Sequence, residues 1–212
     1  MPRTGPVTKD TTTIALGLAQ IRVIGASATY IGQVAPILAA ANSVGALAST
    51  RFVGNTDFFK LESGFPLLED AVFPLREAAS LELAFKEITP KNMALARGLD
   101  PDDYSAAHTG ALPLGTVSTP EVIRMEAVYT YPDGTNTMTI IFPRAQVVAN
   151  TEVDFASEEP AAVAITIESK RADSEVTGGH IIWDGMPLGR IVWNDGTNTT
   201  TTTSSTTTTT AP

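Results

Sequence analysis

Apolar and polar residues alternate with a period of two through much of this chain, and this pattern limits the possible folds strongly. In residues 121–131 the apolar positions are Ile123, Met125, Ala127, Tyr129 and Tyr131, with Arg124, Glu126 and Thr130 between them. Residues 81–86, 138–142 and 163–168 repeat the alternation. Because successive side chains of a strand point to opposite faces, each segment predicts a strand with one apolar face. We therefore predict a mainly β fold, a β-sandwich or partial barrel with long hairpins.

Turn residues between apolar runs predict where the hairpins lie. Residues 51–53 and 58–61 are predicted to be two strands joined by a polar turn at 54–57. Residues 181–183 and 190–193 are predicted to form the final hairpin of the chain.

The chain carries no charged residue from position 23 to position 50. A membrane-spanning helix needs about 20 predominantly apolar residues, and this stretch is long enough. It is interrupted, however, by Gly25, Gly32, Gln33 and Pro36. We predict a buried strand over 21–31 followed by an alanine-rich connection, with no membrane insertion.

One short α-helix is signalled at both ends. Thr89 is a suitable N-cap, and Pro90 suits the first helical position, where its missing N–H costs nothing. Arg97 lies in the last turn, Gly98 fits the left-handed position after the helix, and Pro101 blocks continuation.

Composition excludes several classes of function. The 212 residues include 14 Lys and Arg against 23 Asp and Glu, a net charge of −9, which opposes tight non-specific binding to nucleic acid. The absence of cysteine excludes disulfides, thiolate metal sites and a catalytic cysteine. The charged fraction of 17% is low for a soluble domain, which indicates that part of the surface contacts other protein.

The chain divides into three zones by composition. Residues 1–19 are predicted to be an N-terminal arm, residues 20–196 a β domain, and residues 197–212 a threonine-rich C-terminal tail. The two ends lack the apolar residues needed to fold alone, so we expect them to be disordered in a monomer and ordered by contacts in an assembly.

No catalytic motif occurs in the chain, and we predict neither an enzyme nor a cofactor or metal site. Four weak candidates have simpler explanations as loop, turn or core residues. They are a calcium-binding cluster of Asp100, Asp102 and Asp103, an acid/base pair of Glu158 and Glu159, a base at His180, and a sugar-stacking platform of Trp183 and Trp193.

Two longer segments carry a family resemblance. Phe58-Phe59-Lys60-Leu61-Glu62-Ser63-Gly64-Phe65-Pro66-Leu67 reads as a strand entering a Gly-Pro turn. In Leu81-Glu82-Leu83-Ala84-Phe85-Lys86-Glu87-Ile88-Thr89-Pro90-Lys91-Asn92-Met93-Ala94-Leu95-Ala96 a strand with an acidic residue runs directly into the capped helix. With closing strands near 161–170 and 181–193, this order of elements resembles the major tail tube protein of long-tailed bacteriophages.

The resemblance implies a structural subunit. Six copies would close into a hexameric β-barrel ring, and rings would stack into a hollow conduit for delivering DNA into the host. The implied partners are further copies of the chain, a tail terminator, baseplate or tail-tip proteins, a tape-measure protein, and double-stranded DNA in transient passage without tight binding. The implied location is the virion tail, assembled in the host cytoplasm.

On this interpretation, particular residues are candidates for two surfaces. Channel-lining candidates are Asp57, Glu62, Glu82 and Glu126, which would make the bore acidic or neutral. Inter-subunit hairpin candidates are Arg51, Phe52, Val53, Phe58 and Phe59. The alternatives are a virion or cell-surface module that binds a carbohydrate or receptor through the tryptophan hairpin, and an enzyme of unknown type.

Overall fold

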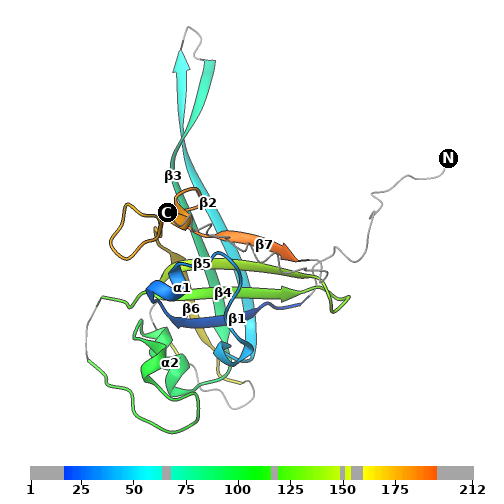
Figure 1. Ribbon diagram of the computed structural model, residues 1–212, viewed down its shortest axis with the longest axis vertical. Helices are drawn as coiled ribbons and strands as arrows, with labels where there is room; N and C mark the ends of the chain where they lie inside the picture. The colour runs from blue at the N-terminus through cyan, green and yellow to red at the C-terminus, as the bar shows by residue number, and fades with distance from the viewer. Residues whose placement is uncertain (1–16, 64–67, 116–118, 149–150, 154–159, 195–212) are drawn as a thin grey trace, which may run out of the picture.

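The computed structural model describes residues 17–63, 68–115, 119–148, 151–153 and 160–194. These described residues form seven antiparallel strands in a single open sheet, which confirms the predicted mainly β fold (Figure 1). The strands are β1 (Gln20–Gly25), β2 (Leu47–Ser63), β3 (Leu68–Phe85), β4 (Ile123–Thr130), β5 (Thr137–Val147), β6 (Val163–Ser169) and β7 (Arg190–Asn194). Their order is β1-β4-β5-β6-β3-β2, with β7 paired to β5 beside this path.

The sheet folds over on itself at β5. The first half of β5 pairs with β7 and its last residues pair with β6, so the sheet changes direction along this strand. In Figure 1 the β2–β3 hairpin accordingly crosses β4 and β5 instead of running beside them. One buried cluster contains Val23 of β1, Met125 of β4, Leu83 of β3 and Ile165 of β6, although β1 and β3 lie far apart in strand order. The apolar faces predicted from alternation therefore meet in a shared core.

The predicted capped helix is present as α2 (Pro90–Ala96). The Thr89 hydroxyl accepts a hydrogen bond from the Asn92 backbone N–H at 3.2 Å. Gly98 has a φ of +69°, the left-handed conformation that glycine adopts at little cost, and the Leu99 N–H returns to the Ala94 carbonyl. The described residues also include a single turn, α1 (Ala28–Ile31), and three short 3-10 helices, η2 (Ala40–Asn42), η3 (Pro101–Asp103) and η4 (Ile181–Trp183).

Three sequence-based predictions are wrong in detail. The strand predicted over 21–31 ends at Gly25, and α1 follows it. The polar turn predicted at 54–57 is part of β2, because β3 supplies pairing partners for each of these residues. Residues 181–183 form η4 and not a strand, since His180 caps a helical turn that brings Trp183 into the protein.

Several predicted features lie outside the described residues. These are most of the N-terminal arm, the threonine-rich tail, and the Glu158-Glu159 turn. In the part of the chain that the structure describes, no helix is long and apolar enough to cross a membrane.

Asn92 joins α2 to the rest of the domain. Its buried amide donates hydrogen bonds to the Val44 carbonyl at 2.9 Å and to the Glu87 carbonyl at 2.7 Å. We expect Asn92→Ala to lower the free energy of unfolding by about 1–3 kcal/mol, because the buried Val44 carbonyl and the partly buried Glu87 carbonyl lose their donor. Urea unfolding of the wild type and the variant measures this difference in free energy. Alanine favours helices, so a loss cannot come from helix propensity, and an unchanged midpoint would contradict the role of Asn92.

Candidate assembly surface

The β2–β3 hairpin extends far beyond the body of the protein (Figure 1). Its strands pair from Leu47 opposite Phe85 to Ser63 opposite Leu68. Among the described residues, β6 pairs with β3 only from Ser80 to Phe85. The part of the hairpin beyond Ala79, which we call the ribbon (residues 54–63 and 68–79), is therefore a two-stranded sheet with open edges on both sides.

The ribbon exposes large apolar side chains to solvent. Phe58 is 57% exposed, Phe73 50% and Leu75 69%. Phe59, Leu61 and Val72 are also exposed. An isolated two-stranded hairpin is marginal in water, and open edges with apolar side chains promote association with other strands. The ribbon thus has the properties of a protein–protein contact surface.

The predicted inter-subunit residues all lie on β2, but in different surroundings. Phe52 lies at the base of the ribbon, where its ring is 6.4 Å from that of Phe142 in β5. Phe58 and Phe59 lie far out on the ribbon and, being adjacent on a strand, point to opposite faces. Arg51 and Val53 share a face, on which Arg51 pairs with Glu82 at 3.2 Å.

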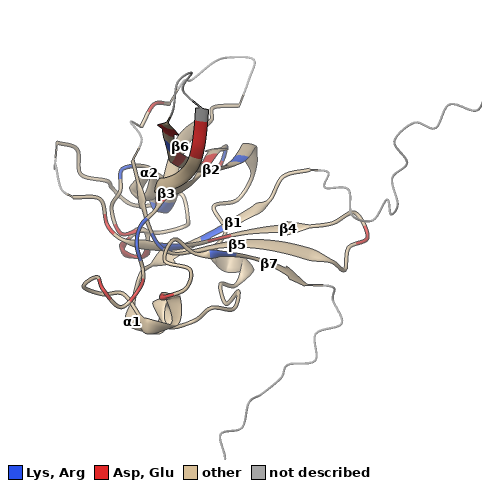
Figure 2. Cartoon of the chain, turned by 90° about the horizontal axis from the view of Figure 1, so that it is seen from above, with Lys and Arg blue, Asp and Glu red and all other residues tan. Residues whose placement is uncertain are grey.

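The face of β2, β3 and β6 that points away from the core is polar. Glu82 lies opposite both Arg51 and Thr166, and beside it Glu168 pairs with Lys170 at 2.6 Å. An open groove of about 530 Å³ on this face is lined by Ser49, Arg51, Glu82, Leu83, Ala84, Glu152, Ala164, Ile165 and Thr166. Viewed from above, residues of both charges occur along the hairpin and the body (Figure 2). The face therefore carries acidic residues whose charge is partly balanced by neighbouring bases.

The four predicted channel-lining carboxylates do not share one surface. Asp57 and Glu82 lie on the same face by strand alternation, whereas Glu62 lies on the opposite face with Lys60. Glu126 has no exposed surface at all, so its expected place on a channel wall is wrong. The reason is that the uncharged segment after β1 covers the face of β4 from which Glu126 projects.

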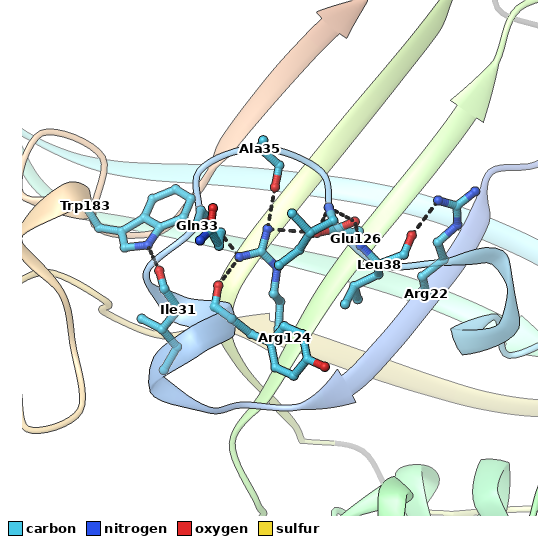
Figure 3. Close-up of polar contacts among 10 residues, drawn as sticks. Arg22, Ile31, Gln33, Ala35, Leu38, Arg124, Glu126 and Trp183 are labelled. Carbon is cyan, nitrogen blue, oxygen red and sulfur yellow. Dashed lines mark hydrogen bonds and ion pairs between the residues drawn. The ribbon is translucent and has the colours of Figure 1, made fainter. Parts of the chain in front are cut away.

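Glu126 instead forms a buried ion pair with Arg124, two residues earlier on β4. The Arg124 Nη2 and Nε atoms lie 2.8 and 2.9 Å from the Glu126 Oε1 atom, and both side chains are fully buried. Burial lowers the pKa of the Arg124 guanidinium, while the hydrogen bond and charge of Glu126 oppose that shift. The pair is surrounded by the backbone of residues 30–38, which we call the strap (Figure 3).

The ion pair provides hydrogen bonds to the strap in both directions. Arg124 donates to the carbonyls of Tyr30, of Gln33 at 2.7 Å and of Ala35 at 2.8 Å. The Glu126 carboxylate accepts from the backbone N–H groups of Ile37 and Leu38, each at 3.0 Å.

Two further side chains hold the ends of the strap. Arg22 of β1 donates to the Leu38 carbonyl at 2.7 Å. The Trp183 indole donates to the Ile31 carbonyl at 2.6 Å (Figure 3).

The tryptophan platform considered for sugar binding is absent. Trp183 is fully buried against Ile31, Ile141 and Ala172, whereas Trp193 on β7 is 64% exposed. The two indoles therefore cannot stack together on one ligand, and the binding module based on a tryptophan hairpin is not supported.

Three of the other weak candidates, Asp100, Asp102 and His180, accept hydrogen bonds from the protein's own backbone. Asp100 accepts from the Asp102 N–H at 3.0 Å, and Asp102 accepts from the Gly25 N–H at 2.8 Å. The His180 Nδ1 atom accepts from the Ile182 N–H at 3.2 Å and so caps η4. Within the described residues, no group of three or more His, Cys, Asp or Glu side chains is placed to hold a metal ion.

The buried ion pair between Arg124 and Glu126 leads to a testable prediction about the free energy of unfolding. We expect Glu126→Ala to lower the free energy of unfolding by about 3–5 kcal/mol, because Arg124 is left buried without its counter-charge. The double variant Arg124→Met with Glu126→Leu should be less destabilised than Glu126→Ala. Glu82→Ala, which removes a partner from an exposed pair, should cost about 0–1 kcal/mol. Denaturant unfolding of the three variants measures these changes. Equal losses of unfolding free energy for Glu126→Ala and Glu82→Ala would contradict a special role of the buried ion pair in stability.

Comparison with known proteins finds similar solved structures, including the following two. A chain of an extracellular contractile injection system, the PVC sheath-tube complex in the extended state, has a TM-score of 0.41 and 12% identity, covering 77% of this chain and 96% of that chain. A chain of the anti-feeding prophage cap, the tube terminating cap, has a TM-score of 0.39 and 13% identity, covering 89% of this chain and 98% of that chain. No protein-family model matches the chain, and no curated protein matches its sequence.

Proposed function

We propose that this chain is the structural subunit of a phage tail tube or a related tube, in which the ribbon joins neighbouring copies. Six copies form a ring, as the sequence resemblance implies, and stacked rings form a conduit for double-stranded DNA. The subunit acts in the virion tail after assembly in the host cytoplasm. Its further partners are a tail terminator, baseplate or tail-tip proteins and a tape-measure protein.

The ribbon is the observation that supports this proposal most directly. Residues 54–63 and 68–79 lack a third strand on either side within the described chain, and they expose Phe58, Phe73 and Leu75. Association with further copies covers these side chains and pairs the open edges. Closure into a ring removes the open edges altogether, as in any β-barrel.

The polar face of β2, β3 and β6 is suited to the inside of the tube. Glu82, Glu168 and Glu152 give this face acidic groups, and Arg51 and Lys170 lie beside the first two. DNA binds tightly to surfaces whose cations neutralise its phosphates. A face with paired charges and no excess of cations allows DNA to move along it.

Substitution of ribbon side chains tests self-association. We expect the wild-type protein to form rings or tubes at high concentration in negative-stain electron microscopy. Phe58→Ser with Phe73→Ser should abolish or strongly reduce these assemblies, because it removes two exposed apolar contacts while leaving the buried core intact.

The matched control is Leu114→Ser, which also replaces an exposed apolar residue, 84% exposed, but lies outside the ribbon. This variant should assemble like the wild type, and all variants should unfold at similar denaturant concentrations. A wild-type protein that stays monomeric at high concentration would overturn the proposed function.

Charge on the polar face is tested separately in assembled tubes. We expect wild-type tubes to retain little DNA at physiological salt, and Glu82→Lys tubes to retain more, with retention falling steeply as salt rises. Glu121→Lys makes the same change of charge at an exposed residue outside this face and serves as control. Equal DNA retention by the two variants would exclude the polar face as the channel wall.

A further inference from the structure

A small hollow lies beside Phe52, where the base of the β2–β3 hairpin crosses β4 and β5. In Figure 1, β4, β5 and β7 extend to the right beyond this crossing. Phe52 is 41% exposed. The hollow, which we call the apolar groove, has a volume of about 160 Å³, and its walls include Thr50, Phe52, Leu81, Ala127, Met138 and Ile140.

The groove carries little charge. Among the described residues that line it, Arg51 is the one charged residue, and its guanidinium is paired with Glu82 at 3.2 Å. The groove therefore suits an apolar, uncharged occupant.

The described chain begins on the wall of this groove. Gly17 and Ala19 both line it, and Ala19 also packs against the main core. Residues 1–16 precede this point, and the last three of them, residues 14–16, are all apolar. No charged residue occurs from position 11 to position 21. An apolar, uncharged segment thus joins the body of the protein at an apolar hollow.

We propose that residues 14–16 dock into the apolar groove of their own copy, with the side chains of Ile14 and Leu16 as the anchors. Composition alone leads to the expectation that the N-terminal arm orders only in an assembly, whereas the groove gives the end of the arm a site within the same chain. The inference concerns a single copy and does not depend on the proposed function.

The size and position of the groove favour this occupant. A cavity of about 150 Å³ can bind benzene, so the groove has room for a leucine or isoleucine side chain. Three extended residues span at most about 11 Å, and residues 14–16 start from Gly17 on the wall itself. Because the segment is tethered there, its effective concentration at the groove exceeds that of the same segment in another copy.

The conformation of Gly17 lets the segment turn toward the groove. Ala19 and Ile21 face the core, whereas Leu18 between them is 50% exposed. An uninterrupted strand would place Leu16 on the same exposed face as Leu18. Gly17 has a φ of +103°, a left-handed conformation that breaks this alternation. Leu16 is thereby released from the exposed face.

Docking of the segment closes the base of the hairpin to other chains. The anchors cover part of Phe52 and Met138, which line the groove. The ribbon starts at residue 54 and stays uncovered. Exposed apolar surface beside the core is therefore protected within one copy, while the ribbon remains available for association.

A cross-link within one chain tests the proposal, because the chain contains no cysteine of its own. Ala15→Cys lies between the anchors, and Thr50→Cys lies on the groove wall. In dilute monomer, a short bifunctional maleimide should join the two within a single chain, which keeps its monomer mass. Adding Ile14→Ser with Leu16→Ser should slow this reaction about tenfold, because both apolar anchors are lost.

Two further variants of the cysteine pair sharpen the test. Gly17→Ala should also slow the reaction, because alanine disfavours the left-handed conformation although its Cβ would meet no atom within 4 Å. Val7→Ser is the matched control, since it replaces an apolar residue of the same arm far from the groove, and it should leave the rate unchanged.

The other outcomes overturn the proposal. Equal rates with and without the anchors would show that residue 15 reaches the groove only as part of an undocked tether. Links between two chains instead of within one would assign the groove to the arm of another copy. Failure of the wild type to assemble at high concentration would remove the proposed function but leave this result unaffected.

Binding of the dye ANS, which detects exposed apolar surface, gives a readout that needs no cysteine. Both chains compared carry Phe58→Ser with Phe73→Ser, which reduces binding of the dye to the ribbon. We expect Ile14→Ser with Leu16→Ser to increase ANS fluorescence, because the apolar groove is then open. Unchanged fluorescence would show that the groove is already open in the chain with intact anchors, which contradicts docking.

Discussion

The ion pair between Arg124 and Glu126 is the interaction on which the body of this protein depends. It projects from β4 on the face opposite the main core, where charges are costly unless every partner is supplied. The strap supplies these partners with backbone groups instead of side chains. An uncharged segment with little regular structure is thereby fixed over β4, and the sheet gains a second protected face.

The β2–β3 hairpin differs from the body, in which the buried charges of Arg124 and Glu126 have hydrogen-bond partners. Its base shares the main core through Leu81, Leu83 and Phe85, whereas in the described part of the chain the ribbon beyond Ala79 has open backbone edges and half-exposed phenylalanines. Among the described residues, the body satisfies a buried arginine with backbone carbonyls, whereas the ribbon has no third strand on either side. The rigid body then fixes the direction in which the ribbon points.

Local sequence patterns were sufficient to predict elements that depend on neighbouring residues or on regular alternation. Strands β4, β5 and β6 followed from alternation, and α2 followed from Thr89, Pro90 and Gly98. Other features depend on distant partners. A polar run at 54–57 has turn-like composition, and only the length of β3 makes it a strand. Glu126 alternates with apolar residues, as a solvent-facing residue of a strand does. The one indication in the sequence that a segment covers it was the absence of charged residues between positions 23 and 50.

The register shifts of the ribbon oppose slippage of β2 against β3. Two of them lie beyond the body, between Asp57 and Phe58 and between Leu61 and Glu62, and in each the extra residue belongs to β3. A regular two-stranded ribbon can slip by one residue, which would turn every side chain of one strand to the other face. Irregularities at fixed positions penalise such slippage, since a slipped strand no longer matches them. The ribbon therefore keeps its pattern of charges and apolar groups in alignment before any partner strand arrives.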